Sequence, residues 1–366
     1  MRVVVTCGGT GGHITPALAI ADLIRERVPR AEILFIGADG GMENELVKNA
    51  GYEIRSLAVR GLSRSLTLRN LKTLQMAHAA IMRAKEILKV FAPDIVIGTG
   101  GYACYPTLRA AITLGIPSAI HESNAVPGLV VKRLAARVDR VWLNFEQAAE
   151  GLPRGAKWRV VGNPLSRGYH TPIPAAHSQG SKKMILSFGG SLGAEKINKA
   201  ILSLMDAQKE QGNIYHLHAT GKRGFSKVEE EFRALGLCQY RNLLLLSYVS
   251  DMPRQMAAAD LVICRAGAMS ISELAALGKA AILIPSPNVT GDHQLKNAMA
   301  LARVGAAVCL REEELSSLTR IVAELLADDA RRAQMSREIR KFHKSEANTL
   351  IFEDIRLLCT KRGKEG

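Results

Sequence analysis

The sequence predicts an α/β protein of two Rossmann-like, doubly wound parallel-sheet domains that face each other across a cleft. Short apolar runs rich in valine and isoleucine alternate with amphipathic stretches of helical length. This alternation stops near residue 161 and starts again near residue 183. Strands that are joined through helices run parallel, with right-handed crossovers. The chain has 366 residues, which is enough for two domains of ordinary size.

The first predicted domain, residues 1–162, opens with a valine-rich strand at 2–7. Thr15 suits the N-cap of the helix that follows at 16–28, and Pro16 suits its first position, where no N–H is required. Four further strands, each short and rich in β-branched residues, are expected at 33–37, 94–98, 117–121 and 138–143. Three further helices are expected at 68–91, 105–114 and 128–136.

The second predicted domain, residues 163–341, follows a linker rich in Pro, His, Gly and Ser that extends to Ser181. Its strands are expected at 183–188, 214–219, 242–247, 260–264 and 280–285. Its helices are expected at 193–206, 225–235, 252–258, 269–277 and 292–304. Charged amphipathic helices fill roughly 312–361, and we expect the C-terminal helix within 342–366 to pack back on the first domain.

The composition is that of a globular protein, with 47% hydrophobic and 23% charged residues. No apolar run approaches the roughly 18–20 residues of a membrane span, and with no secretory signal the cytoplasm is the expected compartment. The six scattered cysteines form no CxxC pair and are expected to be reduced thiols.

The net charge of +15 indicates an anionic partner, and part of it is concentrated between Ile54 and Phe91. That window holds eight basic residues and one acid, hence +7. A basic patch of this kind fits a nucleic acid or a phospholipid surface. Aromatic residues make up only 5% of the chain and no nucleic-acid motif accompanies the basic residues, so a nucleic-acid partner is not expected.

Three glycine loops each follow a predicted strand and precede a predicted helix, at residues 8–13, 98–102 and 189–194. Glycines at this place let a ligand approach the backbone, and a helix N-terminus favours an anion. One such loop alone is as well explained by helix-to-sheet packing, but three of them favour a phosphorylated ligand. None has the P-loop pattern, and no acid stands in a clear ribose position after the strand at 33–37.

The stretch Arg265-Ala-Gly-Ala-Met-Ser-Ile-Ser-Glu273 follows the strand at 260–264. Gly267 and Ser270 suit a strand–helix turn whose N–H groups face a phosphate. Glu273 lies one turn further on, where a carboxylate can accept hydrogen bonds from both hydroxyls of a ribose. The alternative is an ordinary glutamate stabilised by the helix dipole.

Six segments, in their order and spacing, resemble the bacterial N-acetylglucosaminyltransferases of peptidoglycan synthesis, members of glycosyltransferase family 28 with the GT-B fold. The segments are residues 8–16, 100–106, 121–128, 189–198, 265–273 and 292–294. The resemblance covers nearly the whole chain. It implies an inverting transfer of N-acetylglucosamine from UDP-N-acetylglucosamine to the muramoyl 4-hydroxyl of lipid I, the undecaprenyl-pyrophosphoryl-MurNAc-pentapeptide, which gives lipid II.

The same resemblance implies the roles of individual residues. His13 resembles the residue proposed as the catalytic base. The predicted substrate-binding residues are Thr10, Gly11, Gly12, Asn124, Ser191, Val249, Ala268, Met269, Ser270, Ile271, Ser272, Glu273 and Gln294. The first four would contact the donor from the first domain, and Ser191 would approach the diphosphate. Val249 would meet the uracil, residues 268–273 would hold the phosphates and ribose, and Gln294 would read the sugar hydroxyls.

Three positions depart from the family pattern. Ser123 stands where the family usually has Gln, and Cys104 stands where it usually has Ser. Ser166 stands where an arginine is expected, with Arg167 one step along, so no uracil-side arginine is assigned.

The chemistry needs a base and a positive field on the leaving UDP. Imidazole titrates near neutrality, so His13 suits the first task; the alternative is a histidine that only binds phosphate or shapes the turn. The chain has no Asp-x-Asp pair, so we expect no metal and no cofactor, with helix N-termini stabilising the diphosphate instead.

A membrane partner follows from the basic window and from lipid I together. On the predicted helix 68–91, Leu71, Leu74, Ile81 and Leu88 form one stripe, while Arg69, Lys72, Met76 and Arg83 lie opposite. This pattern suits a peripheral protein on the cytoplasmic side of the cell membrane that contacts an anionic surface; a solvated charged face is the alternative. Cell-wall synthesis and division proteins are further candidate partners. Alternative functions are another GT-B enzyme, such as a UDP-N-acetylglucosamine epimerase or a diacylglycerol glycosyltransferase.

Overall fold

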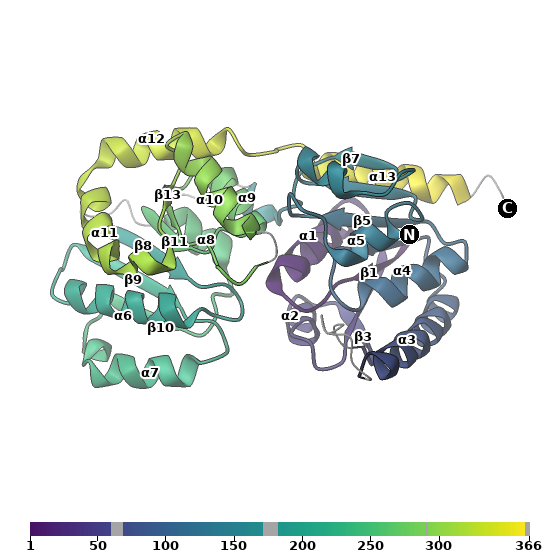
Figure 1. Cartoon of the computed structure of the whole chain (residues 1–366), viewed down its shortest axis with the longest axis horizontal. Coiled ribbons are helices and arrows are strands. Elements are labelled where there is room, and N and C mark those ends of the chain that lie inside the picture. Colours follow the sequence, from purple (N-terminus) through teal and green to yellow (C-terminus); the bar gives the residue numbers. More distant parts are fainter. Residues whose placement is uncertain (60–68, 171–181, 290–291, 363–366) are drawn as a thin grey trace. The chain divides into compact units, whose positions relative to one another are not determined.

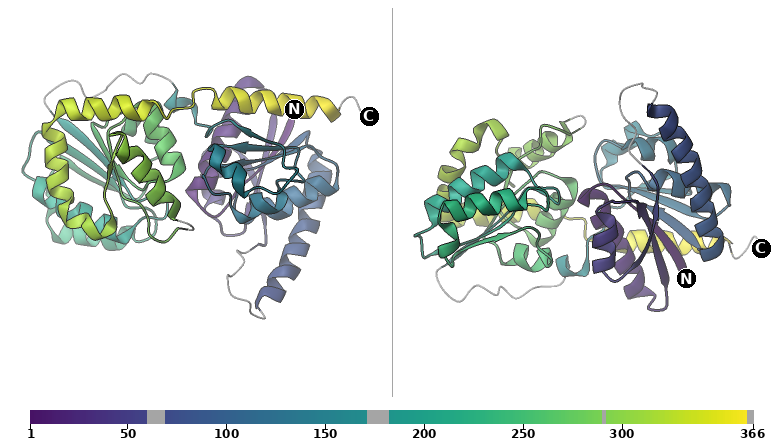
Figure 2. Two further views of the ribbon diagram at one scale, coloured as in Figure 1. Left: turned by 45° about the horizontal axis from the view of Figure 1, so that its top comes forward. Right: turned by 90° about the horizontal axis from the view of Figure 1, so that it is seen from below.

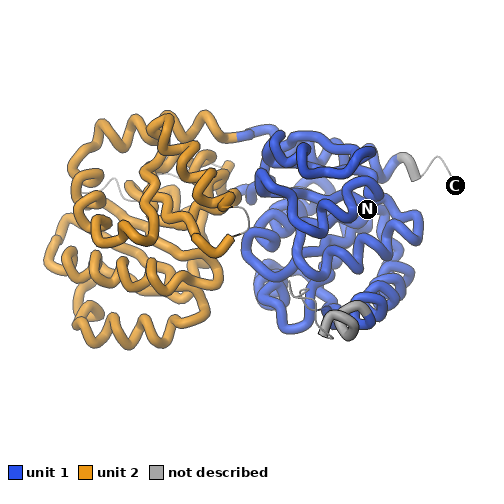
Figure 3. Tube along the Cα trace, in the orientation of Figure 1, with its two compact units in different colours: residues 1–167, 344–366 blue, residues 168–343 orange. Residues whose placement is uncertain are grey.

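The structure is a computed structural model that describes residues 1–59, 69–170, 182–289 and 292–362. The chain divides into two compact units (Figures 1 and 3). Unit 1 comprises residues 1–167 and 344–366, and unit 2 comprises residues 168–343. The sequence-based boundaries, 1–162, 163–341 and 342–366, stay predictions.

Unit 1 is built on a seven-stranded sheet with the order β3-β2-β1-β4-β5-β6-β7. All of its neighbouring strands pair in parallel. The strands are β1 (Arg2–Thr6), β2 (Glu32–Ala38), β3 (Glu53–Leu57), β4 (Ile95–Gly98), β5 (Ser118–Glu122), β6 (Arg140–Leu143) and β7 (Trp158–Val160). The chain order reverses direction between β1 and β4, so this pair forms the switch point of a doubly wound sheet.

Helices cover both faces of this sheet (Figure 2). They are α1 (Gly11–Arg27), α2 (Glu43–Asn49), α3 (Arg69–Phe91), α4 (Cys104–Thr113), α5 (Leu129–Leu134) and α13 (Ala347–Arg362). The alternation of side chains along β1 divides the core: Val4 packs with residues of α3 and α4, whereas Val3 and Val5 pack with residues of α1 and α13. A strand with both faces buried reads as a continuous apolar run, as β1 does.

The C-terminal helix α13 belongs to unit 1, although it is far from the rest of that unit in sequence. The buried carboxylate of Asp354 accepts a 2.9 Å hydrogen bond from the indole N–H of Trp142, on strand β6 next to the edge strand β7. Arg159 of β7 lies 3.3 Å from the same carboxylate. These contacts, with Ile351 and Ile355 in the core, place α13 beside α1.

Unit 2 repeats the plan with a six-stranded parallel sheet in the order β10-β9-β8-β11-β12-β13. Its strands are β8 (Lys183–Phe188), β9 (Ile214–Ala219), β10 (Leu243–Leu246), β11 (Leu261–Cys264), β12 (Ala281–Leu283) and β13 (Val308–Cys309). Its helices are α6 (Glu195–Gln208), α7 (Phe225–Ala234), α8 (Met252–Ala258), α9 (Ala268–Leu277), α10 (His293–Arg303), α11 (Leu318–Ala327) and α12 (Asp329–Arg340). The switch point here lies between β8 and β11.

These two sheets confirm the predicted fold class, and one predicted helix start is wrong. Helix α1 begins at Gly11, and its N-cap is Thr10, in an extended conformation. Thr15 is therefore not the cap, and Pro16 lies inside the helix. Pro16 has no N–H to donate, so the helix lacks one backbone bond at this place. The earlier start puts His13 within the first turn of the helix rather than in the loop before it.

Candidate active site

The predicted site loops follow the central strands of both sheets. In unit 1, the loop that starts at Gly8 follows β1, and the loop that starts at Thr99 follows β4. In unit 2, the loop that starts at Gly189 follows β8, and the turn at Arg265 follows β11. Each pair of strands flanks the switch point of its own sheet, where open α/β sheets bind ligands at the carboxyl ends of their strands.

The two ring nitrogens of His13 have different roles: Nδ1 contacts the glycine loop, and Nε2 is the candidate proton acceptor. Its Nδ1 lies 3.0 Å from the carbonyl oxygen of Gly8, and 3.4 Å from the hydroxyl of Thr10. A carbonyl can only accept, so the Nδ1 carries the proton in this contact. The neutral ring then keeps the lone pair on Nε2. This tautomer is the one that a general base needs.

The second glycine loop packs against His13 and the first glycine loop. A Cβ on Gly100 would lie 2.5 Å from Cδ2 of the His13 ring, and a Cβ on Gly101 would collide with the backbone of Gly8. The Thr99 hydroxyl donates to the carbonyl of His13 over 2.7 Å. Packing thus explains the glycines of this loop.

Cys104 performs the local task expected of a hydroxyl. Its thiol is buried and lies 2.9 Å from the carbonyl oxygens of both Thr6 and Gly100, which share its one S–H donor. Burial raises the pKa of Cys104 to about 12, so the thiol stays protonated and can donate. The departure from serine therefore keeps the hydrogen bonds that close this loop.

The carboxylates of two buried glutamates of unit 1 accept hydrogen bonds from backbone amides. Glu43 accepts from the amides of Ala38, at 2.9 Å, and Gly9, at 3.2 Å. Glu122 accepts from the amides of Asn124, at 2.9 Å, and Gly128, at 2.7 Å. These carboxylates hold the loops in place, which leaves His13 as the side chain suited to take a proton at this switch point.

Asn124 and His121 lie next to Glu122. The Asn124 side-chain amide donates to Glu122 over 3.1 Å, which fixes its orientation and leaves its oxygen as an acceptor. His121 is fully buried, with Nε2 3.0 Å from the carbonyl of Gly162, and burial lowers its pKa to about 4. His121 is thus a neutral structural residue.

The third glycine loop, which holds Ser191, packs against the turn after β9. Gly193 has a φ of +82°, and a Cβ on it would collide with the carbonyl of Thr220. The half-buried Ser191 stands two residues before it. Below the loop, the Ser187 hydroxyl lies 2.8 Å from both His216 Nε2 and His218 Nδ1. Both histidines are buried, and burial lowers the pKa of each.

Helix α9 carries six of the predicted residues, 268–273, on its first two turns. Its N-cap, Gly267, is extended with a φ of −70°, and the amide of Ile271 already donates to the Gly267 carbonyl. The amides of the first turn therefore point out of the helix N-terminus, where they favour an anion. The side chains of Ala268, Met269 and Ile271 are buried, so the predicted contact of these residues with a ligand would have to be made by their backbone.

Arg265 and Gln294 shape the rim of the unit 2 site. Arg265 donates to the carbonyls of Ile284 and Pro285, and forms a 2.6 Å ion pair with Glu312. The side-chain oxygen of Gln294 accepts from the Ser286 amide over 2.9 Å. Gln294 therefore has its NH₂ group left to donate, for example to a sugar hydroxyl.

Glu273 is buried, with only 8% of its surface exposed. Burial raises the pKa of Glu273 to about 7, and the nearby Tyr169 hydroxyl acts on this pKa in the opposite direction. Tyr169 lies in the 3₁₀ turn η2 (Arg167–Tyr169) and was not among the predicted residues. No motif accompanies it in the sequence, so sequence reasoning had no signal by which to find it.

Val249 is buried, and it follows β10, one strand beyond β9 from the switch point. Its position at the carboxyl end of the sheet fits a contact with a base, and its role stays a prediction. Among the residues that the structure describes, no three or more His, Cys, Asp or Glu side chains form a group suited to a metal ion.

The structure describes only part of the basic window between Ile54 and Phe91. Arg60 and Arg64 lie outside the described residues, and nothing is described of the side chains of Arg69 and Lys72. Ile81 and Leu88 pack in or against the core of unit 1, as predicted for the apolar stripe, and Arg83 is exposed and paired with Glu86. No helix in the described ranges is both long enough and apolar enough to cross a membrane.

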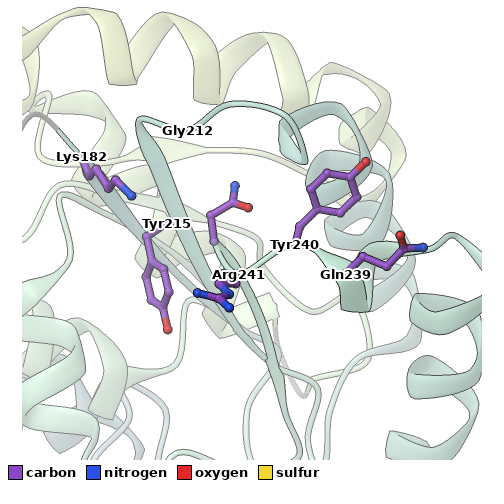
Figure 4. A pocket seen from close by; sticks show the side chains of 7 residues that line it. Lys182, Gly212, Tyr215, Gln239, Tyr240 and Arg241 are labelled. Carbon is purple, nitrogen blue, oxygen red and sulfur yellow. The ribbon is translucent and has the colours of Figure 1, made fainter.

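A separate hollow of about 320 Å³ lies at the opposite end of the unit 2 sheet, where β8, β9 and β10 begin (Figure 4). It is lined by Lys182, Gly212, Tyr215, Gln239, Tyr240, Arg241 and Asn242. None of these is a predicted site residue. Because nucleotides bind at the carboxyl ends of such sheets, this hollow is distinct from the candidate active site.

Comparisons with known proteins agree with this arrangement. A model of the glycosyltransferase family 28 N-terminal domain matches residues 3–143, and one of the family 28 C-terminal domain matches residues 184–350. A protein of Acetivibrio thermocellus is 38% identical over 366 residues, covering 97% of this chain and 98% of its own. One of Alkaliphilus oremlandii is 43% identical over 322 residues, covering 86% and 87%. Both are named UDP-N-acetylglucosamine–N-acetylmuramyl-(pentapeptide) pyrophosphoryl-undecaprenol N-acetylglucosamine transferase.

Among solved structures, that of Acinetobacter baumannii MurG matches with a TM-score of 0.70 and 28% identity. It covers 97% of this chain and 99% of its own.

Proposed function

The chain belongs to glycosyltransferase family 28, and from that premise we propose how its two units divide the transfer of N-acetylglucosamine to lipid I. The enzyme is an N-acetylglucosaminyltransferase that uses UDP-N-acetylglucosamine and forms lipid II in peptidoglycan synthesis. The identity of 38% to such a transferase over nearly the full length of both chains carries this conclusion.

Unit 2 binds the donor in this proposal. The N-terminus of α9, with Ser270, Ser272 and the loop of Ser191, holds the diphosphate through amides and hydroxyls. Glu273 accepts from the ribose hydroxyls, Val249 packs on the uracil, and Gln294 donates to the sugar. The buried position of Glu273 supports its role, because a carboxylate out of water binds hydroxyl donors without competition from solvent.

His13 of unit 1 is the proposed base, and Thr10, Gly11, Gly12 and Asn124 are proposed to contact the donor beside it. The muramoyl 4-hydroxyl oxygen attacks the anomeric carbon and its proton passes to Nε2 of His13. The bond from the anomeric carbon to the phosphate oxygen breaks, and UDP leaves with the electron pair. Attack from the face opposite the leaving group inverts the anomeric carbon.

Product analysis tests this function. UDP-N-acetylglucosamine and a lipid I analogue with a shortened chain should give UDP and the disaccharide product in equal amounts. The donor alone should give no N-acetylmannosamine derivative. An epimerase would convert the donor without an acceptor, and a diacylglycerol glycosyltransferase would use diacylglycerol in place of lipid I. Either result would contradict the proposal.

We further propose that the protein works as a peripheral protein on the cytoplasmic side of the cell membrane, docking through α3. Two large apolar side chains of this helix are exposed, Met82 at 48% and Val90 at 76%, next to the basic residues Arg83 and Lys89. Exposed apolar groups among cations suit an anionic lipid surface, worth about 1 kcal/mol per basic residue. Contacts with cell-wall synthesis and division proteins stay a prediction of the resemblance.

Vesicle binding tests the membrane proposal. Reversal of Arg83, Lys85 and Lys89 to Glu should weaken binding to anionic vesicles by roughly 10- to 100-fold. The matched control reverses three exposed basic residues of unit 2, Lys227, Arg233 and Arg320, which removes the same charge. Equal losses in the two variants would mean that α3 is not the docking surface.

A further inference from the structure

We propose that Glu43 is a positioning residue for His13, and that it acts through the peptide unit between Gly8 and Gly9. The carboxylate fixes this peptide, and the peptide keeps a proton on Nδ1 of the imidazole. The inference rests on the proposed function, which makes His13 the base. It gives a part in the proton transfer to the first residue of α2, to which the family resemblance gave no role.

One peptide unit bonds to both side chains. The amide of Gly9 donates to Oε2 of Glu43 over 3.2 Å. Nδ1 of His13 lies 3.0 Å from the carbonyl oxygen of Gly8, which belongs to the same peptide unit. The C=O and N–H of a trans peptide point in opposite directions, so the carboxylate and the imidazole lie on opposite sides of it. Two hydrogen bonds therefore join Glu43 to His13 in one continuous chain.

The carboxylate of Glu43 has little room to move. The side chain is fully buried, and its Oε1 accepts from the amide of Ala38, at the end of β2, over 2.9 Å. A Cβ on Gly8 would lie 2.7 Å from the same oxygen, and a Cβ on Gly41 would collide with the carboxylate. Because β1 and β2 are neighbours, Glu43 joins the loops that follow both strands.

The contacts of Nδ1 favour the carbonyl as its partner. The hydroxyl of Thr10 is the longer contact, at 3.4 Å, and a hydroxyl can either donate or accept. The carbonyl of Gly8 is closer and can only accept, so it sets where the ring carries its proton. Gly9 has a φ of +88°, a conformation that favours glycine and that brings its amide to Glu43.

This chain of bonds suits a base. When Nε2 takes the proton of the muramoyl hydroxyl, the O–H bond breaks, an N–H bond forms, and the ring becomes positively charged. The proton on Nδ1 stays in place. In catalytic triads a carboxylate bonded directly to Nδ1–H orients the ring and stabilises the imidazolium. Here a peptide lies between the two, and hydrogen bonds in a chain polarise one another, so donation to Glu43 makes the Gly8 carbonyl a better acceptor.

NMR of histidine labelled at its ring nitrogens tests the proposal, with His13→Ala to identify the signals of His13. In the wild-type protein, the neutral ring should carry its proton on Nδ1. Glu43→Gln keeps the shape of the side chain but turns an NH₂ group toward one of the two amides. The population with the proton on Nδ1 should then fall. In the same variant kcat should fall roughly 10- to 100-fold, with the KM for UDP-N-acetylglucosamine within about twofold of the wild type.

Glu122→Gln is the matched control. Glu122 is a second buried glutamate of unit 1 whose carboxylate accepts two backbone amides, at 2.9 and 2.7 Å, from Asn124 and Gly128. Neither amide belongs to the peptide that contacts His13, so this variant should leave the proton on Nδ1. Thermal unfolding measures the loss of stability in both variants.

A double variant separates positioning from structural support. Added to His13→Ala, the change Glu43→Gln should lower the residual kcat by less than about twofold, because the two residues act as one unit. An equal loss of kcat with and without His13 would make Glu43 a structural residue only, and would overturn the proposal.

Two further results distinguish this inference from the proposed function. A proton on Nε2 of the wild-type His13 would break the chain, whether or not Glu43→Gln folds, and would leave the transferase activity standing. A near-normal kcat for His13→Ala would instead remove the base from the proposed function, and this inference with it.

Discussion

The two switch points of this enzyme use their buried glutamates in opposite ways. In unit 1, Glu43 and Glu122 each accept two backbone amides, so their oxygens serve the loops around them. In unit 2, Glu273 is also buried, and among the described residues no hydrogen bond from a backbone amide to its carboxylate is found. The first arrangement completes a scaffold, and the second keeps acceptor positions for a ligand.

The difference shows how a binding carboxylate can be distinguished from a structural one. Backbone amides repay the cost of taking a carboxylate out of water, whereas Glu273 meets that cost only in part. In the proposed function, unit 1 therefore contributes a stabilised loop with the ring of His13. Unit 2 contributes a carboxylate whose burial would be compensated when the ribose binds.

Substitution of His13 should have the largest effect. His13→Ala should lower kcat by about 10²- to 10⁴-fold, the usual contribution of a positioned base. Donor affinity should change little, because the helix N-termini of unit 2 remain.

Steady-state kinetics and donor titration check this prediction. A variant with near-normal kcat and weak binding of UDP-N-acetylglucosamine would assign His13 to phosphate contact instead. Glu122→Gln is the control, since its carboxylate is bonded to the amides of Asn124 and Gly128 and is expected to affect stability more than kcat.

Alanine substitution of Glu273 and of Glu43 should give the next largest effects, on donor binding in the first case and on stability in the second. Glu273→Ala should raise the KM for UDP-N-acetylglucosamine by about 10- to 100-fold, because two ribose hydroxyls lose a charged acceptor. Glu43→Ala should cost roughly 2–5 kcal/mol of unfolding free energy, because two buried amides lose theirs. Kinetics and urea unfolding of both variants check this. If Glu273→Ala destabilised the protein as strongly as Glu43→Ala, the distinction between the two carboxylates would be lost.

The pH dependence of stability sharpens the same comparison. The pKa of Glu273 is about 7 in the folded protein and near 4.5 when unfolded, so the folded state binds more protons between these values. Its contribution to stability is present at low pH and is lost as pH rises from about 4.5 to 7. The free energy of unfolding of Glu273→Gln should therefore exceed that of the wild type by on the order of 2 kcal/mol at pH 8, and by much less at pH 5. A gain in unfolding free energy that does not depend on pH would show that folding does not raise the pKa of Glu273.

Removal of metal should have the smallest effect. Because the proposed function gives the stabilisation of the diphosphate to helix N-termini, we expect activity in EDTA to stay within about twofold of the untreated enzyme. Complete loss on chelation that Mg²⁺ or Mn²⁺ restores would assign the leaving group to a metal. Apo enzyme assayed with and without added Mg²⁺ supplies the comparison.

Strand–helix alternation was sufficient to predict the class of fold, because the central strands of both sheets are buried on both faces and are apolar runs. The start of α1 was misplaced, since the stop signals Gly11, Gly12 and Pro16 are all accommodated within one helix. The strand β3 was missed because Glu53 and Arg55 make it polar at the sheet edge. Such residues depend on tertiary pairing, which a local pattern does not contain.

The residues around the site show the same limit. Loops with a chemical signature, such as those of His13 and Glu273, were found from their glycines and spacing. Glu43 and Tyr169 were not, because each meets its partner only after the chain has folded. The sequence predicts Gly100 as part of an anion loop, and the structure adds a packing reason for this glycine, the ring of His13 beside it.

The position of α13 has a consequence for the order of events at the ribosome. Residues up to Arg167 emerge first, but Trp142 finds its acceptor only when Asp354 has been made. At about 5–20 residues per second, this interval lasts roughly 10–40 s. All of unit 2 is synthesised within it. The unit that is started first is therefore the last to be completed, and the nascent chain must keep one apolar face of its first sheet from aggregating until its final helix arrives.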